Sequence, residues 1–153
     1  MRKPDFVIGD PSNPYMLRWW LIPRNRLLNV YLHKFCRDDD DQALHDHPWL
    51  SLSIVVRGGY YDITNGPDGT QQRRWYGPWS VIARGASSAH RVELARDPES
   101  SVVGEWRKPI AAWTLFITGP RIREWGFLCP QGWRHWREFT AGKHGEMVGK
   151  GCE

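Results

Sequence analysis

The sequence predicts an all-β fold, a closed antiparallel barrel or sandwich built from short strands. Segments that alternate apolar and polar residues recur along the chain, and turns rich in Gly and Pro separate them. The 153 residues include 15 Gly and 11 Pro, a content that favours turns over long helices. No segment has helical periodicity. A helical bundle is therefore excluded, and the length suits a single domain.

Three regions are expected along the chain. Residues 1–14 carry three prolines and few apolar positions, and 15–22 are a short apolar run closed by Pro23. We expect residues 1–26 to form an N-terminal arm that packs on the barrel. Residues 27–140 hold the barrel itself. Residues 141–153 are rich in Gly and Lys, which is typical of a flexible tail.

The strand candidates are runs of β-branched and aromatic residues bounded by turn residues. They are 27–36, 49–56, 60–64, 71–76, 80–83, 90–94, 110–118 and 124–129. The sequence Asn-Gly-Pro-Asp-Gly at 65–69 is a strong hairpin signal. Four consecutive aspartates at 38–41 are expected to form a solvated turn, because no calcium-loop spacing accompanies them. Residues 95–109 are expected to form a polar loop.

Composition limits the partners and the compartment. The formal charge of +4 is not concentrated in any run of Lys or Arg, so no nucleic-acid partner is expected. No membrane partner is expected either, because no apolar stretch approaches the roughly 20 residues of a spanning helix, and the first residues lack a signal peptide. Cys36, Cys129 and Cys152 are widely spaced, which predicts free thiols in a reducing cytoplasm.

Ten tryptophans are the compositional anomaly. Most of them are expected to fill a small barrel, with their N–H groups at its rim. A pocket that stacks flat ligands is the alternative.

The sharpest motif is His45-Asp46-His47. Residues two apart on a strand point to the same face, so both imidazoles can reach one point. Imidazole is the commonest protein ligand for transition metals. His90, on a later strand candidate, supplies a third imidazole. Two histidines that are merely polar residues at a strand start are the alternative, and Asp46 between them is expected to point away from the site.

These residues resemble the cupin superfamily of small jelly-roll barrels. Its first motif, G-x5-H-x-H-x3/4-E-x6-G, matches the segment that runs from His45 and His47 through Ser51 to Gly58. Its second motif, G-x5-P-x-G-x2-H-x3-N, matches in part the segment that ends at His90. The resemblance covers about residues 43–94. It implies a single-domain cupin jelly roll with one divalent metal held by the three histidines.

The position of the family's glutamate ligand holds Ser51 or Leu52, neither of which is a good metal ligand. Three imidazoles without a carboxylate resemble cysteine dioxygenase and other thiol dioxygenases. The resemblance implies an Fe(II)-dependent dioxygenase acting on a small polar molecule that bears a thiol or a carboxylate, with Zn or Ni as other metals. Two alternatives stay open: a sugar-type isomerase or epimerase cupin, and a cupin that only binds a small ligand.

Several residues are candidates for the remaining roles. A carboxylated substrate needs a fixed cation, and Arg57 shares strand parity with Ser51 and Ser53, so it faces the cavity if the strand has no bulge. These three residues and Trp49 are the substrate-binding candidates. Alternative cations are Arg18, Arg24, Arg26, Arg84 and Arg91.

The weaker candidates concern catalysis and a fourth ligand. Tyr60 and His135 are candidate proton carriers, and His135 belongs to a Trp-rich C-terminal segment that suits a lid or a dimer contact. His33 is a candidate fourth ligand, although a histidine on a half-buried strand is more often only hydrogen-bonded.

A homodimer is expected as well. Cupins commonly pair, and one face of the predicted strand 49–56 is apolar and needs cover from the N-terminal arm or a second subunit. That face carries Leu50, Leu52, Ile54 and Val56.

Overall fold

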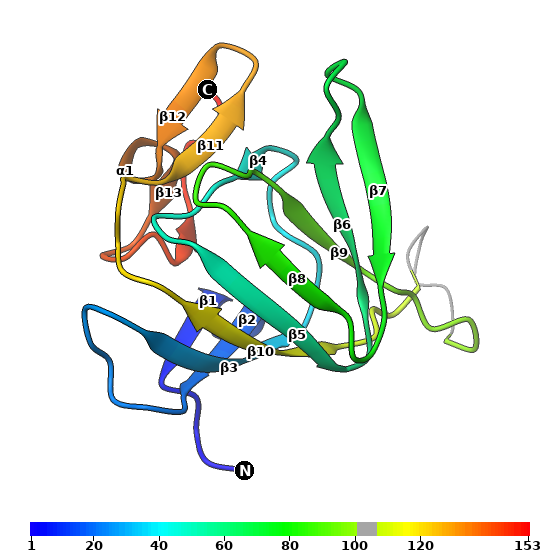
Figure 1. Ribbon diagram of the computed structural model, residues 1–153. Coiled ribbons are helices and arrows are strands. Elements are labelled where there is room, and N and C mark those ends of the chain that lie inside the picture. The colour runs from blue at the N-terminus through cyan, green and yellow to red at the C-terminus, as the bar shows by residue number, and fades with distance from the viewer. Residues whose placement is uncertain (101–106) are drawn as a thin grey trace.

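The computed structural model describes residues 1–100 and 107–153, in which a six-stranded antiparallel sheet faces an opposite wall of shorter antiparallel strands (Figure 1). The larger sheet has six strands in the order β1-β2-β3-β10-β5-β8. Their bounds are β1 Phe6–Asp10, β2 Asn13–Trp20, β3 Asn29–Phe35, β10 Ala112–Thr118, β5 Ser51–Arg57 and β8 Val81–Arg84. The all-β prediction is confirmed.

The opposite wall consists of two three-stranded sheets. One has the order β7-β6-β9, with bounds Gln71–Tyr76, Tyr60–Asn65 and Arg91–Leu94. The other has the order β12-β11-β4, with bounds Gly132–His135, Gly126–Cys129 and Leu44–His45. A single bridge between His45 and His90 joins them. The short helix α1 (Trp136–Phe139) and the pair β13 (Thr140–Ala141) and β14 (Met147–Val148) complete the chain.

Alternation explains how the six-stranded sheet presents its inner face. Along β10 the residues Ala112, Thr114, Phe116 and Thr118 are buried, and those between them are half-buried. The core beneath includes Val55 and Leu94, which are 0% and 2% exposed. The hairpin predicted at 65–69 joins β6 to β7, and Asp68 accepts hydrogen bonds from Thr70 there.

All eight predicted strands are present, but the chain contains more. The expected arm holds β1 and β2, which extend the large sheet beside β3. The turn between β1 and β2 was not predicted. In it the Asp10 carboxylate accepts from the amide and the hydroxyl of Ser12. The predicted polar loop 95–109 lies partly outside the described residues.

The expectation of free thiols is wrong for two of the three cysteines. Cys129 and Cys152 form a disulfide, while Cys36 is free. The tail that was expected to fray is therefore tied to β11. Spacing along the sequence conceals this pairing, because the chain turns back through β12 and β13. The cytoplasmic location stays a prediction that the cysteines no longer support.

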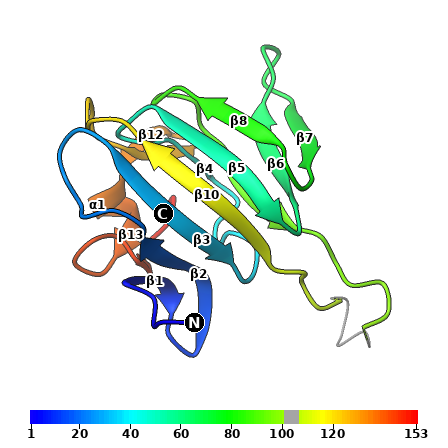
Figure 2. The same cartoon turned by 60° about the horizontal axis from the view of Figure 1, so that its bottom comes forward.

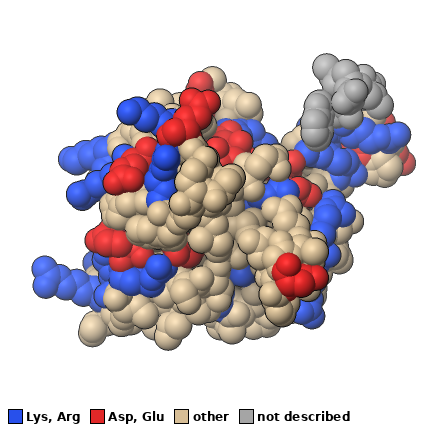
Figure 3. All heavy atoms as spheres, turned by 90° about the horizontal axis from the view of Figure 1, so that it is seen from above, with Lys and Arg blue, Asp and Glu red and all other residues tan. Residues whose placement is uncertain are grey.

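The outside of the molecule is mixed in charge. Seen from above, Lys and Arg side chains alternate with Asp and Glu around uncharged groups (Figure 3). Within the described residues, no helix is long and apolar enough to cross a membrane.

Candidate metal centre

A pair of backbone hydrogen bonds brings two of the three predicted histidines together. His45 lies on β4 and His90 directly precedes β9. The amide of each donates to the carbonyl of the other at 2.9 Å. His47 follows two residues after His45, and its amide donates to the Ala86 carbonyl at 3.0 Å. The HxH segment and the segment before β9 are thus fixed side by side.

The three rings converge. Their centroids lie 4.9, 5.2 and 5.3 Å apart, and one ring nitrogen from each lies within 4.8 Å of the others. The Nε2 atoms of His47 and His90 are 3.0 Å apart. Two metal–nitrogen bonds of about 2.1 Å at a right angle separate their nitrogens by about 3.0 Å. The donor set and its spacing therefore fit a transition-metal ion.

Asp62 on β6 orients the His90 ring. One carboxylate oxygen lies 2.6 Å from His90 Nδ1, and the other accepts from Arg84 at 2.7 Å. Burial lowers the pKa of His90 to about 4, against the opposing effect of Asp62. Because a carboxylate only accepts, the neutral ring carries its proton on Nδ1 and leaves Nε2 free for a ligand bond. Sequence reasoning missed Asp62, since one carboxylate on a strand gives no signal.

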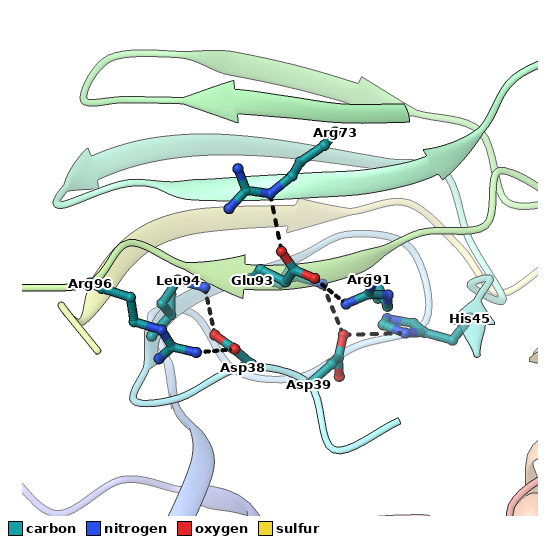
Figure 4. A network of polar contacts seen from close by, with 9 residues as sticks. Asp38, Asp39, His45, Arg73, Arg91, Glu93, Leu94 and Arg96 are labelled. Carbon is teal, nitrogen blue, oxygen red and sulfur yellow. Dashed lines mark hydrogen bonds and ion pairs between the residues drawn. The ribbon is translucent and has the colours of Figure 1, made fainter. Parts of the chain in front are cut away.

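The prediction of a solvated turn at 38–41 is wrong for Asp38 and Asp39, which are half-buried, whereas Asp40 is exposed. Figure 4 shows Asp38 and Asp39 directed at β9. Asp38 accepts from the Leu94 amide at 2.7 Å, and Asp39 accepts from the Val92 amide at 3.1 Å. Asp39 also lies 3.7 Å from His45 Nδ1. Burial raises the pKa of the Asp39 carboxyl, while His45 and the Val92 amide lower it. These carboxylates hold the loop on the sheet and support the His45 ring.

Asp46, between the two histidines, faces away from the site as predicted. It is 3% exposed. Its carboxylate accepts from the Gly126 amide at 2.8 Å and from Trp133 Nε1 at 3.0 Å, and pairs with Arg123 at 2.6 Å. Asp46 therefore fastens β11 and β12 to the strand that carries the histidines.

A cavity of about 530 Å³ opens beside the three histidines. The inner face of β3 and β10 forms one wall, with His33 and Phe116. The predicted residues Trp49, Ser53 and Tyr60 also line it. Tyr60 forms a side-chain hydrogen bond with Ser53, and burial raises the pKa of its hydroxyl. The indole N–H groups of Trp49 and Trp136, another lining residue, are buried without a hydrogen-bond partner among the described residues.

Among the described residues, the arginines that line this cavity are Arg18 on β2, Arg24 and Arg121, and Arg57 is not one of them. Arg18 lines the cavity and donates from Nε to His33 Nε2 at 2.9 Å. Its guanidinium lies over the Tyr31 ring, 4.8 Å from the centroid. Burial lowers the pKa of Arg18 to about 10. Among the described residues no carboxylate lies within ion-pair distance of this guanidinium, so the half-buried Arg18 has no counter-ion.

Three candidates lie elsewhere. The register between β5 and β10 shifts at Val55 and Arg57, so a bulge turns Arg57 outward, where it is exposed. Ser51 is absent from the residues that line the cavity, although it begins β5. His135 bonds to Glu124 at 2.8 Å and caps α1, also away from the cavity. The prediction for Arg57 assumed strict alternation along the strand, and a bulge has no fixed residue signature by which the sequence could reveal it.

His33 stands in the cavity wall without joining the cluster. The group that could hold a metal comprises His45, His47 and His90. His33 is 3% exposed, and burial followed by the nearby Arg18 charge lowers its pKa well below the usual value. Its Nε2 atom accepts from Arg18, so the ring positions the arginine.

Comparisons with known proteins identify the fold. The sequence matches no family model and no curated protein. Among solved structures, the chain is similar to Fe(II)-HppE with an alternative substrate, at 12% identity and a TM-score of 0.52. That match covers 78% of this chain and 58% of HppE, so the chain spans less than two thirds of that protein.

Two further structures match at the same TM-score of 0.52. A double-stranded β-helix protein from Klebsiella pneumoniae is 12% identical, over 78% of this chain and 90% of that one. A protein from Ralstonia eutropha, provisionally assigned as a mannose-6-phosphate isomerase, is 17% identical, over 76% and 92% of the two chains. The chain has the cupin double-stranded β-helix fold, as the two sequence motifs predicted.

Replacing Asp46 tests its role as a fastening. Asp46→Ala leaves the Gly126 amide, the Trp133 indole and Arg123 without their acceptor, and we expect the free energy of unfolding to fall by about 3 kcal/mol. Urea denaturation followed by circular dichroism measures it. The control Glu138→Ala changes an exposed carboxylate on α1 and should cost less than about 0.5 kcal/mol. Equal costs for the two variants would contradict this role.

Proposed function

We propose that this chain binds one divalent transition-metal ion, Fe(II) in its working form, through His45, His47 and His90, and oxygenates a small organic anion. The observation that carries the proposal is the convergence of three imidazole nitrogens within 4.8 Å at the end of a cavity. Three neutral ligands leave the ion its full charge, which favours an anionic substrate. A bound Fe(II) supplies Lewis acidity and one-electron redox chemistry at this point.

The protein's own part is to orient the ligands and exclude water. Asp62 fixes the protonated nitrogen of His90, and Asp39 supports His45. Phe116 and Phe127 line the cavity next to the histidine rings. The Phe116 ring centroid lies 6.2 Å from that of His47, and the Phe127 ring centroid lies 5.8 Å from that of His45. Such apolar walls lower the local dielectric constant and strengthen every charge interaction inside.

Arg18 supports the choice of an anion as substrate. A half-buried guanidinium without a counter-ion loses part of its hydration, and a carboxylate that enters the cavity offsets this loss through a bidentate contact. The guanidinium nitrogens Nη1 and Nη2 can make this contact with the carboxylate, because only Nε donates to His33. The unpartnered indole donors of Trp49 and Trp136 favour a ligand rich in oxygen acceptors.

Oxygen uptake distinguishes this proposal from its alternatives. Fe(II)-loaded protein should consume dioxygen in the presence of a thiol or carboxylate substrate, whereas a sugar isomerase or a pure binding protein should not. The Ralstonia neighbour, provisionally a mannose-6-phosphate isomerase, makes phosphosugars the first compounds for the opposing assay.

Metal content tests the ligand set. Wild-type protein loaded with Fe(II) or Zn(II) and then desalted should hold about one ion per chain by elemental analysis. His90→Ala should lose at least about 90% of it, because two imidazoles alone bind these ions weakly. The control His135→Ala removes a histidine outside the cavity and should keep the full content. Undiminished metal in His90→Ala would move the site elsewhere.

The anion site has a separate test. Arg18→Leu should weaken the binding of small carboxylates, such as propionate and mercaptoacetate, by about tenfold or more, because a charge-assisted pair is lost. Calorimetric titration of the metal-free protein measures this without any contribution from the ion. Arg26→Leu, an exposed arginine outside the cavity, is the control. Unchanged affinity in Arg18→Leu would refute the assignment.

A homodimer is the second part of the proposal. The outer face of the six-stranded sheet carries aliphatic side chains at its centre, which is unusual for an antiparallel sheet that meets water. The strand register aligns two rows of half-buried aliphatic side chains, and no described element covers them in Figure 2. They are Val30, Ile117 and Leu52 in one row and Leu32, Leu115 and Ile54 in the other.

A second copy of this chain is the occupant that fits this face. The N-terminal segment covers only one edge of this face, where Trp19, the partner of Leu32 in register, is 5% exposed and donates to the Arg2 carbonyl. The strands β1 and β2 extend the sheet sideways and leave β3, β10 and β5 open. A stable pair needs about 800 Å² from each partner, so the interface would extend beyond the six aliphatic side chains of β3, β10 and β5. The face is also free of Asp and Glu at the six central positions.

A charged residue in the centre of the face should separate the copies. We expect wild-type protein to sediment at twice 17.9 kDa and Leu115→Glu to sediment as a monomer, because a carboxylate would be buried unpaired. Leu128→Glu on β11, where Leu128 is 39% exposed, is the control and should stay dimeric. Analytical ultracentrifugation measures both. A wild-type monomer at all concentrations would contradict the proposal.

A further inference from the structure

The last 14 residues form a strap that lines one side of the cavity. The strap comprises Thr140–Glu153, with the pair β13 and β14 at its centre. It runs between the hairpin of β11 and β12 and the edge strand β1, as both ribbon views show (Figures 1 and 2). Its residues that line the cavity are Thr140, His144, Gly145, Glu146, Met147 and Val148.

Few contacts hold the strap to β1 on the far side of the cavity. The Gly9 amide on β1 donates to the Glu146 carbonyl at 2.7 Å. Phe6 and His144 meet edge to face with their ring centroids 6.1 Å apart. Met147 and Val148 are 50% and 60% exposed. Such a segment buries little apolar surface, and Gly142 and Gly145 at φ 86° and 75° add freedom to the unfolded strap.

The two ends of the strap are fixed much more firmly. At the start, Phe139 is 1% exposed and stacks on Phe127 with a centroid distance of 3.6 Å. At the other end, Cys152 is bonded to Cys129 on β11. The Arg134 side chain donates to the Gly151 carbonyl at 2.8 Å, and the Gly151 amide donates to the Phe139 carbonyl at 3.0 Å. The covalent bond is the strongest element that keeps the second end in place.

We propose that the Cys129–Cys152 disulfide is a redox latch that controls access to the cavity through this strap. With the bond intact, β14 is held against β13 and β1 and the mouth is narrowed. Without it, residues 147–153 gain the conformational entropy of a free terminus, and their few contacts no longer hold them. Both cysteines are partly exposed, so a reductant can reach the bond.

The switching step is a thiol–disulfide exchange with a dithiol reductant. One reductant thiolate attacks a sulfur of the disulfide, and the second reductant thiol resolves the mixed disulfide. The Cys129–Cys152 bond breaks and takes up two electrons and two protons to give two thiols. The reductant leaves as its own disulfide. Exchange with a disulfide oxidant, which takes up the two electrons and two protons and leaves as a dithiol, reverses the step.

Hydrogen exchange of the metal-free protein tests the latch independently of any metal or substrate. Amides of residues 140–149, together with the Gly9 amide, should exchange about tenfold faster or more after reduction with dithiothreitol. In the same samples, diethyl pyrocarbonate should modify His45, His47 and His90 faster, since the mouth is open. Mass spectrometry of peptides reads both. Cys152→Ser should behave as the reduced protein, and Cys36→Ser should behave as the oxidised wild type.

Two results would overturn the latch. Exchange in the strap and at Gly9 that is unchanged after complete reduction would show that the disulfide does not hold it. Exchange that rises equally in β5 and β10 would show that the bond stabilises the whole fold and not the strap alone. Reduced wild-type protein carries no substitution, so the test stands even if Cys152→Ser folds poorly.

Discussion

The structure of the candidate site depends on one short stretch of antiparallel pairing. His45 and His90 exchange two backbone hydrogen bonds of 2.9 Å, and residues paired in this way have their side chains on the same face of the sheet. Because side chains alternate along a strand, His47 then returns to the face of His45. The convergence of three imidazoles is thus set by backbone register, before any metal contributes.

Carboxylates then convert this register into ring orientation. Asp62 holds the Nδ1 side of His90, Asp39 stands beside His45, and Asp46 points outward to secure β11 and β12. Each of the three carboxylates therefore has a different role, although all of them lie near a histidine of the cluster. The opposite wall of the cavity carries Arg18, so a fixed positive charge faces the same volume as the three neutral donors, and the carboxylates of Asp39, Asp40 and Asp41 also line that volume.

The part of this arrangement that sequence could predict is the part with regular spacing. The HxH pair, the later His90 and the alternating strands have fixed periods, and the structure brings these histidines together. Arg57 was expected to face the cavity but does not, because a bulge between β5 and β10 interrupts the alternation of side chains along β5. Arg18 and Asp62 carry no spacing signal, since their partners lie 15 and 28 residues away along the chain. The prediction of free thiols was wrong for the same reason. Cys129 and Cys152 are 23 residues apart and meet only through tertiary folding.

The central claim, that these three rings share one metal ion, is tested most directly by a crystal of Fe(II)- or Zn(II)-loaded protein and the anomalous scattering of the metal. The account predicts one anomalous peak per chain, about 2.0 to 2.2 Å from one nitrogen of each of His45, His47 and His90. A peak among the aspartates at 38–41, or one that contacts fewer than three of these rings, would contradict it.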